Sequence, residues 1–259
     1  MSKWRGKSEN SQLRCEAADN TAARKGLKTR MEQHVIRVIA RIQSDFQEKF
    51  GIPRQSGLVE ALRSTVVFEP EYRNPEALRG IEGFSHLWLI WQFSEAVRAD
   101  WSPTVRPPRL GGNARLGVFA TRSPFRPNAI GLSCVRLEAV RVDPALGTVL
   151  DVAGADLLDG TPIYDIKPYL PYADCRPEAA GGFAAQAPEA KLKVAVPPAL
   201  LAAVPPEKRQ ALLGVLAQDP RPSYHHDPTR SYGMRFGGLE VRFTVDGDRL
   251  TVTEIRPGA

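Results

Sequence analysis

A series of short apolar runs, with almost no long helix between them, is the feature that most restricts how this chain can fold. The runs lie between His34 and Asp174 and read HVIRVIARI, STVVFE, FSHLWLIWQF, ARLGVFA, AIGLSCVRLEAVRV and GTVLDVAGADL. They are rich in Val, Ile, Leu and aromatic residues and are separated by Gly and Pro turns, a pattern that predicts β-strands. A helical piece is expected only around residues 75–78. Because parallel strands need long crossover connections, the pattern favours an antiparallel sheet or barrel over a βαβ array.

The composition changes on both sides of this strand-rich part, which we place at residues 33–175. Residues 1–32 carry eight basic and four acidic residues with little apolar periodicity. This composition predicts a disordered extension, and Met31 offers an alternative start. After residue 175 the stretch CRPEAAGGFAAQAPEAKLKVAVPP is typical of a linker, which we place at 176–190.

The remaining residues, 191–259, predict a small α+β subdomain. PEKRQALLGVLAQD has the apolar spacing of an amphipathic helix, with Pro206 near its start. LEVRFTVDGDRLTVTEIRP contains two alternating runs around Asp246–Gly247, a dipeptide that commonly forms hairpin turns.

Several kinds of protein are disfavoured by composition. No apolar run approaches the ~18–20 residues that cross a bilayer, and MSKWRGKSEN lacks the apolar core of a signal peptide, so we expect a cytoplasmic protein without a membrane anchor. The three cysteines show no C-x-x-C spacing, and His225 and His226 are adjacent, which is typical of exposed turn residues; we expect no metal site. The chain also has no G-x-G-x-x-G, Walker or G-x-S-x-G motif of a nucleotide-binding or hydrolase fold.

Arginine is concentrated in one segment of a chain whose net charge is +6. Between Arg98 and Arg126 there are six arginines, no lysine and one acidic residue, Asp100. The planar guanidinium suits phosphate oxygens and stacking on bases, whereas lysine supplies a point charge. The segment therefore predicts a surface for a polyanion, with a solvated basic face as the alternative.

Three motifs carry polar groups suited to ligand binding. KFGIPRQSGLV places Arg54 and Gln55 in a turn, and GADLLDGTPIYDIKPYLPYAD sets aspartates beside apolar groups and a glycine turn. Each also has a purely structural interpretation, as an exposed turn or as turn-forming Asx residues. The third motif, RLGVFATRSPFRPNAIGLS, reads as two strands joined by a loop that Pro124 and Pro127 stiffen.

In order and spacing, the motifs PRQ, EGFSHLWLIWQF, PTVRPPRLGGNARLGVFATRSPFRPNAIGLS, DLLDGTPIYDIKPYLPYAD and LAQDPRPSY closely resemble one family, the TrmO (TsaA-like) tRNA N6-methyltransferases. The resemblance covers residues 33–259. It implies a single β-barrel methyltransferase domain, unlike Rossmann-type enzymes, with S-adenosylmethionine as methyl donor. It further implies a homodimer with the donor site near the dimer interface. The implied substrate is N6-threonylcarbamoyladenosine at position 37 of tRNA, beside the anticodon.

Matching the family motifs residue by residue implies a donor-binding set drawn from four segments. Ser94 and Glu95 stand where the family pattern varies, and Ala129 occupies a position often held by proline. The implied donor-binding residues are Arg54, Gln55, Ser56, Ser94, Glu95, Arg122, Leu132, Asp156, Leu157, Leu158 and Asp159.

Further residues would take part in proton transfer and in binding of the tRNA. The substrate nitrogen must lose a proton, and the candidates for a base are Asp159, Asp165 and Tyr169, none of which the sequence singles out. An alternative function is a non-catalytic RNA-binding barrel of the same family, against which the intact motifs argue. The residues expected to contact the anticodon region of tRNA are Arg106, Arg109, Arg115, Arg126, Tyr172, Arg221 and Arg230.

Overall fold

The computed structural model describes residues 33–98, 100–107, 110, 114–185, 192–222 and 227–258. The predicted disordered extension at 1–32, Arg109 and the pair His225–His226 lie outside these described residues. Within the described part of the chain, no helix is both long and apolar enough to cross a membrane.

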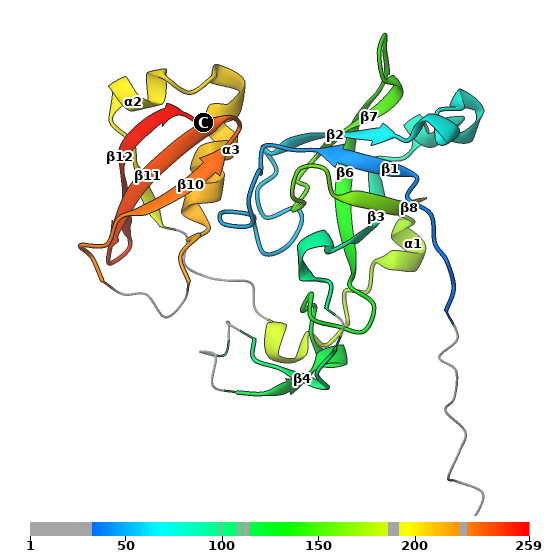
Figure 1. Ribbon diagram of the computed structural model, residues 1–259, viewed down its shortest axis with the longest axis horizontal. Coiled ribbons are helices and arrows are strands. Elements are labelled where there is room, and N and C mark those ends of the chain that lie inside the picture. Colours follow the sequence, from blue (N-terminus) through cyan, green and yellow to red (C-terminus); the bar gives the residue numbers. More distant parts are fainter. Residues whose placement is uncertain are drawn as a thin grey trace, which may run out of the picture. The chain divides into compact units, whose positions relative to one another are not determined.

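Six strands close into a ring, in the order β1-β2-β7-β6-β3-β8 (Figure 1). Every neighbouring pair in the ring is antiparallel. The closed ring confirms the predicted mainly β fold and removes the exposed sheet edges that an open sheet would leave. The strands are β1 (Ala40–Gln43), β2 (Arg63–Phe68), β3 (His86–Gln92), β6 (Ile130–Asp143), β7 (Gly147–Ala153) and β8 (Pro162–Pro168).

Every second side chain along the strands points inward and fills the interior of this barrel. On β3 the side chains of Leu87 and Leu89 are fully buried and Trp91 is 6% exposed, while the residues between them are half-buried. This period of two agrees with the strand prediction, which rested on apolar and aromatic composition between turns. Short 3-10 turns cover the connection from β2 to β3: η1 (Pro70–Tyr72), η2 (Pro75–Leu78), where helix was expected, and η3 (Ile81–Gly83).

Two predicted strands differ from the structure. HVIRVIARI forms a strand only at its end, as β1 (Ala40–Gln43). ARLGVFA contributes only β5 (Leu116–Gly117), which pairs with β4 (Thr104–Val105) in a separate two-stranded sheet and then continues as η6 (Val118–Ala120). In both cases apolar composition was read as strand, although a strand also requires a hydrogen-bonding neighbour along its length.

The C-terminal part is a four-stranded sheet of order β10-β11-β12-β9 with helices on one face (Figure 1). Helix α3 (Pro206–Ala217) buries Leu212, Val215 and Leu216 against it, which confirms the predicted amphipathic helix. A shorter helix, α2 (Pro198–Ala202), precedes it. The strands are β9 (Lys193–Ala195), β10 (Tyr232–Phe236), β11 (Leu239–Asp246) and β12 (Arg249–Pro257).

Two details of this C-terminal part correct the sequence analysis. The predicted linker at 176–190 contains η7 (Gly182–Ala184), and the linker-like composition that follows it includes β9, which pairs in parallel with β12. The hairpin between β11 and β12 is confirmed, but its last pair is Asp246 with Arg249, so the two loop residues are Gly247 and Asp248. Gly247 adopts a φ of 56°, a conformation that glycine permits and most residues disfavour.

Candidate functional site

A buried chain of hydrogen bonds ends at Asp156, in the loop that follows β7. Ser133 Oγ on β6 donates to Asp156 Oδ1 over 2.6 Å, and Trp91 Nε1 on β3 donates to Ser133 Oγ over 3.0 Å. An indole N–H can only donate, so the Ser133 hydroxyl accepts from Trp91 and directs its own hydrogen to Asp156. This geometry makes the Asp156 carboxylate the final acceptor of the chain.

The register of β3 and β6 makes this arrangement possible. Trp91 pairs with Gly131, and a Cβ placed on Gly131 would lie 2.4 Å from Cε2 of the Trp91 ring. Only glycine leaves room for the ring there. Ser133, two positions further along β6, faces the same side of the strand and is 1% exposed.

The environment of Asp156 acts on its pKa in opposing directions. Burial raises the pKa of the carboxyl group above the ordinary value of 3.8. The Ser133 hydrogen bond, the positive charge of Arg122 and the backbone N–H of Ser56 each lower it, but burial is the largest effect. A half-buried carboxylate with cationic and hydrogen-bonding neighbours is suited to holding a polar, positively charged ligand group.

Residues 54–57, the turn that follows Pro53 in the PRQSG motif, are fixed beside Asp156 by contacts from three other segments. Cys134 N donates to Ser56 Oγ over 3.2 Å, and Gly57 N donates to Gly154 O over 2.9 Å. Arg122 Nη1 donates to Gln55 Oε1 over 2.5 Å. Of the predicted donor-binding residues, the structure therefore brings Gln55, Ser56, Arg122 and Asp156 together.

The other predicted donor-binding residues have different settings. Arg54 and Ser94 are exposed. Glu95 on η4 (Ser94–Ala96) forms an ion pair with Lys49, at 3.1 Å between Oε2 and Nζ, and its carbonyl oxygen also accepts from Lys49. Leu132 is 50% exposed and, one position from Ser133, lies on the opposite face of β6.

The end of the GADLLDG motif turns partly into the core. The Leu157 side chain is 1% exposed and belongs to the barrel core, whereas Leu158 is half-buried. Asp159 Oδ1 accepts from Ser44 N over 2.9 Å, which ties the motif to the end of β1. These contacts assign Leu157 and part of Asp159 to holding the loop.

The three candidates for a base have different surroundings. Asp165 on β8 forms an ion pair with Lys167, at 2.8 Å between Oδ2 and Nζ. Burial, together with nearby acidic groups, raises the pKa of Tyr169, which keeps its phenol protonated at neutral pH. Asp159 remains exposed apart from its bond to Ser44.

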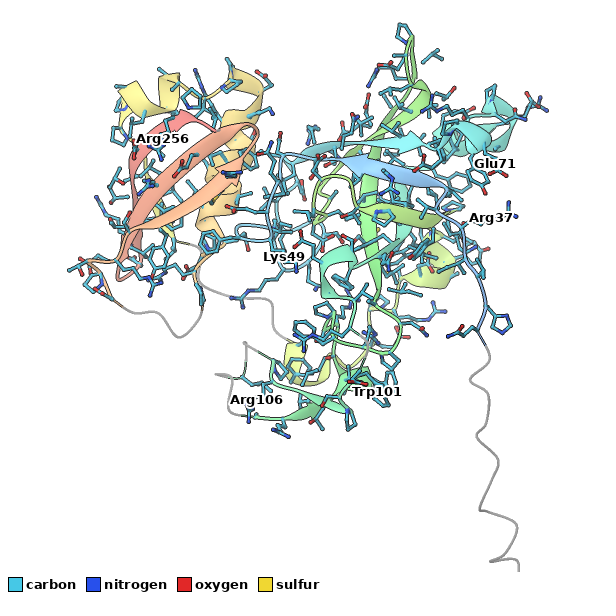
Figure 2. The ribbon with its side chains drawn as sticks, in the orientation of Figure 1. Arg37, Lys49, Glu71, Trp101, Arg106 and Arg256 are labelled. Carbon is cyan, nitrogen blue, oxygen red and sulfur yellow. The ribbon has the colours of Figure 1, made fainter. Side chains whose placement is uncertain are left out.

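The segment that connects β3 to β6 carries several exposed arginines and aromatic residues. Trp101 is 52% exposed and lies with Arg106 near β4 (Figure 2). The Trp101 ring is 6.1 Å from that of Phe119, and Arg98 lies 3.9 Å from the centre of the Phe125 ring. Guanidinium groups and aromatic faces are the groups on which unpaired bases stack.

The residues predicted to contact tRNA differ in how freely they can do so. Arg106 and Arg115 are exposed. Arg126 is half-buried and donates to Thr121 O over 3.2 Å. Tyr172 is 83% exposed on α1 (Pro171–Asp174), whereas the Arg221 side chain is 11% exposed and bonded twice to Asp219. Arg230 is exposed near the Tyr232 ring.

A surface hollow of about 430 Å³ lies at the start of β2. None of the residues predicted to form a site lines it. Within the described residues no group of three or more His, Cys, Asp or Glu side chains is arranged to hold a metal ion. The lining residues are Gln43, Ser44, Asp45, Arg63, Ser64, Thr65 and Asp151.

The sequence analysis missed two members of the site, Trp91 and Ser133. Both lie within motifs that were recognised, but they were taken as strand residues. A serine at an inward position of an apolar strand was the available signal, because a buried hydroxyl needs a hydrogen-bond partner.

Comparison with known proteins assigns both parts of the chain to one family. Residues 41–175 match the model of the tRNA-methyltransferase O N-terminal domain, and residues 189–258 match that of the TrmO C-terminal domain. Crystal structures of TrmO from Pseudomonas aeruginosa superpose with TM-scores of 0.71 and 0.69, at 37% and 35% identity. They cover 89% and 87% of this chain and 100% of each known chain.

Curated relatives agree with the family models. The tRNA (adenine(37)-N6)-methyltransferase of Escherichia coli K12 is 43% identical over 227 residues, which are 83% of this chain and 95% of that protein. A protein of Pyrococcus abyssi described as a probable S-adenosyl-L-methionine-binding protein is 41% identical over 140 residues, 54% of this chain and 70% of that protein. The chain therefore belongs to the TrmO family of tRNA methyltransferases.

Proposed function

We propose that this protein transfers a methyl group from S-adenosylmethionine to N6 of the adenosine at position 37 of tRNA. The substrate nucleoside in this proposal is N6-threonylcarbamoyladenosine. The proposal is supported by membership of the TrmO family and by relatives named tRNA (adenine(37)-N6)-methyltransferase. The observation that carries it is the half-buried carboxylate of Asp156, bonded to Ser133 and placed near Ser56 and the positive charge of Arg122.

These residues fit the amino-acid head of S-adenosylmethionine. That head carries a positive ammonium and a negative carboxylate. The site offers one negative group, Asp156, and one positive group, Arg122. Asp156 would accept hydrogen bonds from the ammonium, and Arg122 would donate to the carboxylate. Gln55 would hold Arg122 in place through the bond between them. Ser94, Glu95, Leu132, Leu158, Asp159 and Arg54 would contact the remaining parts of the donor, and Leu157 would act through its backbone.

When bound, S-adenosylmethionine would supply an electrophilic methyl group attached to a sulfonium. The protein would contribute alignment of the substrate nitrogen and exclusion of water, which together account for much of the rate in displacement reactions. A carboxylate in contact with the sulfonium would stabilise the ground state. We therefore assign Asp156 to the polar end of the donor and not to its sulfur.

The proton of the substrate nitrogen would leave to Asp159, Asp165 or water. Asp165 already forms an ion pair with Lys167, so accepting the proton would compete with that contact. A phenol with a raised pKa is poorly suited to accept a proton, so we assign Tyr169 a hydrogen-bonding role.

The arginines and aromatic residues between β3 and β6 would bind the anticodon loop. Arg106, Arg115 and Arg126 would contact phosphates or the threonyl carboxylate of the modified base, and Tyr172 would stack on a base. Arg109 and Arg230 remain candidates. Arg221 is a poorer one, because Asp219 already binds its guanidinium.

A homodimer in the cytoplasm completes the proposal. The outer face of β6 exposes Ile130 by 40% and Leu132 by 50%, and burial of such side chains against a second copy would be favourable. Because Leu132 and Ser133 are adjacent, an interface on this face would lie near Asp156.

Methylation of defined tRNA tests the proposed function. The protein is incubated with methyl-labelled S-adenosylmethionine and with matched tRNA that carries or lacks the threonylcarbamoyl group. Label at N6 of adenosine 37 only in the modified tRNA is the expected result. Binding of both tRNAs without any label would instead support the non-catalytic RNA-binding barrel.

A further inference from the structure

The segment between β1 and β2 is shared between the candidate site and the core of the C-terminal part. Phe46, Val59 and Leu62 come from this segment, yet they are 1%, 5% and 2% exposed within the core formed by α3 and the β10–β12 sheet. The Phe46 ring packs edge-on against Phe236, with ring centres 5.6 Å apart. The segment is therefore an integral part of the C-terminal core.

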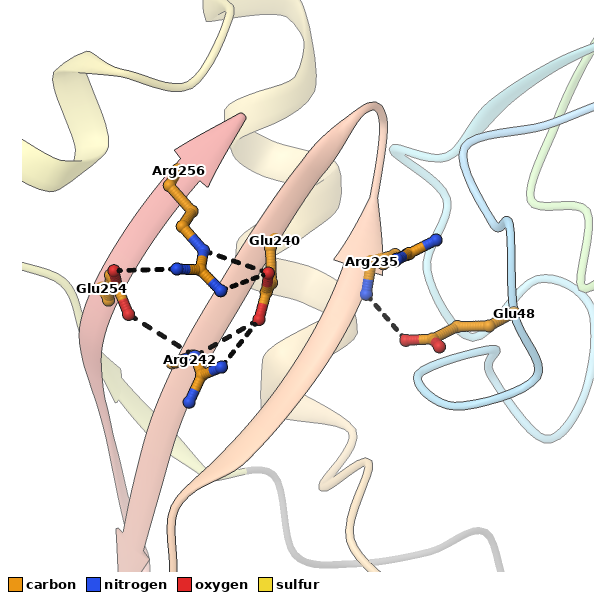
Figure 3. A network of polar contacts seen from close by, with 6 residues as sticks. All are labelled: Glu48, Arg235, Glu240, Arg242, Glu254 and Arg256. Carbon is orange, nitrogen blue, oxygen red and sulfur yellow. Dashed lines mark hydrogen bonds and ion pairs between the residues drawn. The ribbon is translucent and has the colours of Figure 1, made fainter. Parts of the chain in front are cut away.

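Polar contacts join the same segment to the edge of the C-terminal sheet. Arg235 N on β10 donates to Glu48 Oε1 over 2.9 Å (Figure 3). Gly237 N donates to the carbonyl oxygen of Asp45 over 2.8 Å, and Lys208 Nζ on α3 lies 2.5 Å from Asp45 Oδ1. Glu48 thus satisfies an N–H of edge strand β10 that has no strand partner on that side.

The opposite side of the segment holds the candidate site. Gln55 accepts from Arg122, Ser56 accepts from Cys134 N, and Gly57 donates to Gly154. Only three positions separate Ser56 from Val59. Displacement of Val59 would therefore be transmitted directly to the 54–57 turn.

Val59 meets helix α3 at a glycine. A Cβ placed on Gly214 would lie 2.7 Å from Cγ1 of Val59, closer than atoms in contact can come. Glycine in a helix interior is unfavourable by about 1 kcal/mol relative to alanine. Its presence at this position allows α3 to approach the segment closely.

We propose that the contact between Val59 and Gly214 makes the C-terminal part a positioning element, which holds the 54–57 turn in the conformation that binds the methyl donor. The donor half of this inference rests on the proposed function. Val59 and Gly214 are positioning residues, since neither belongs to the candidate site. The physical basis is that a site held in its binding conformation loses less entropy when the ligand binds.

Matched substitutions in the same core distinguish an effect on the 54–57 turn from a general loss of stability. Val59→Ala and Val245→Ala remove the same atoms from the same apolar core, but Val245 pairs with Leu250, beyond the last pair that β10 makes with β11. Gly214→Ala pushes against Val59. In the double variant Val59→Ala/Gly214→Ala, the added methyl group would occupy space that the valine vacates.

Hydrogen exchange and donor binding are the two measurements. We expect amides 54–57 to exchange at least about fivefold faster in Val59→Ala and in Gly214→Ala than in the unchanged protein, through local opening. The affinity for S-adenosylmethionine should fall by a similar factor, roughly 1 kcal/mol by the conversion of tenfold per 1.4 kcal/mol. Val245→Ala should change neither quantity, and the double variant should recover to within about twofold on both, as expected for coupled neighbours.

Equal effects of Val59→Ala and Val245→Ala, or no recovery in the double variant, would overturn the inference. The exchange measurement needs no donor and decides the positioning role by itself. If the unchanged protein does not bind S-adenosylmethionine while the exchange pattern is as expected, the proposed function fails and the positioning role stands.

Discussion

Arg122 donates from Nη1 to Oε1 of Gln55 over 2.5 Å, which joins two loops 67 positions apart in the chain. The guanidinium has further N–H groups, so it can hold Gln55 and still donate to an anionic ligand. Both residues come from motifs identified in the sequence, and their contact is the clearest sign that these motifs serve one site.

Arg122→Ala should weaken binding of S-adenosylmethionine by roughly ten- to a hundredfold, the value of a charged hydrogen bond. Gln55→Ala should have a smaller effect, because Gln55 acts partly by orienting Arg122. Calorimetric titration of the donor into both single variants and the double variant measures their coupling. Arg126→Ala should leave donor affinity unchanged and reduce use of tRNA; the opposite pattern for the two arginines would reverse their assigned roles.

Asp156→Asn should weaken donor binding most at high pH. The ionised carboxylate attracts the donor ammonium, so affinity of the unchanged protein should fall as pH drops through the raised pKa of Asp156. The asparagine variant should lack this pH dependence. Titrations of both proteins from about pH 4 to pH 8 make the comparison, and parallel curves would exclude Asp156 as the ammonium ligand.

The same raised pKa predicts how stability depends on pH. A carboxyl group whose pKa is higher in the folded state than its ordinary 3.8 binds more protons when folded, so its contribution to stability is lost as pH rises from 3.8 through the folded-state value. Asp156→Asn removes that loss. Urea denaturation should therefore show the variant gaining stability relative to the unchanged protein as pH rises across this window.

Ser133→Ala should destabilise the fold by about 1–3 kcal/mol, because it leaves the buried Trp91 N–H without its acceptor. The matched control is Ser64→Ala on β2, a serine that is 8% exposed and outside the Trp91–Ser133–Asp156 chain. Its expected cost is smaller, because the Trp91 N–H keeps its acceptor when Ser64 is replaced. Denaturant midpoints for the two variants give the difference, and equal losses would mean that the hydrogen-bond chain adds nothing to stability.

Binding of tRNA should weaken steeply with salt if the exposed arginines contact phosphates. Arg106→Ala and Arg115→Ala should each reduce the slope of log affinity against log salt concentration by about 0.9. Filter binding between about 50 and 200 mM salt provides the slopes, and affinity that is constant over this range would rule out phosphate contacts. Arg221→Ala, whose guanidinium is held by Asp219, should leave the slope unaltered.

Ile130→Glu should convert the proposed homodimer into a monomer, since it places a charge on the exposed outer face of β6. Analytical ultracentrifugation of the unchanged protein and the variant distinguishes the two states. Val142→Glu is the matched control, a 78% exposed apolar residue at the far end of the same strand. An unchanged protein that sediments as a monomer would remove the dimer from the proposal.

Much of the fold could be predicted because its signals are local. Apolar runs between turns identified β3 and β6, alternating runs around a turn identified the hairpin of β11 and β12, and helical spacing identified α3. Prediction was weakest where local composition resembled a strand without a pairing partner, as in ARLGVFA, and where a strand was too short to show alternation, as in β9. Strand β8 was not among the predicted strands, because its motif was interpreted for its aspartates and its glycine turn.

The sequence by itself determined the kinds of elements and the motifs that carry polar chemistry, since both depend on residues close together in the chain. It did not reveal that the ring closes between β1 and β8, that Trp91 reaches Asp156 through Ser133, or that Val59 packs on Gly214. Only the tertiary structure decided these contacts. Each depends on strand register and helix placement between distant segments, and those follow from packing of the whole core, which no local pattern encodes.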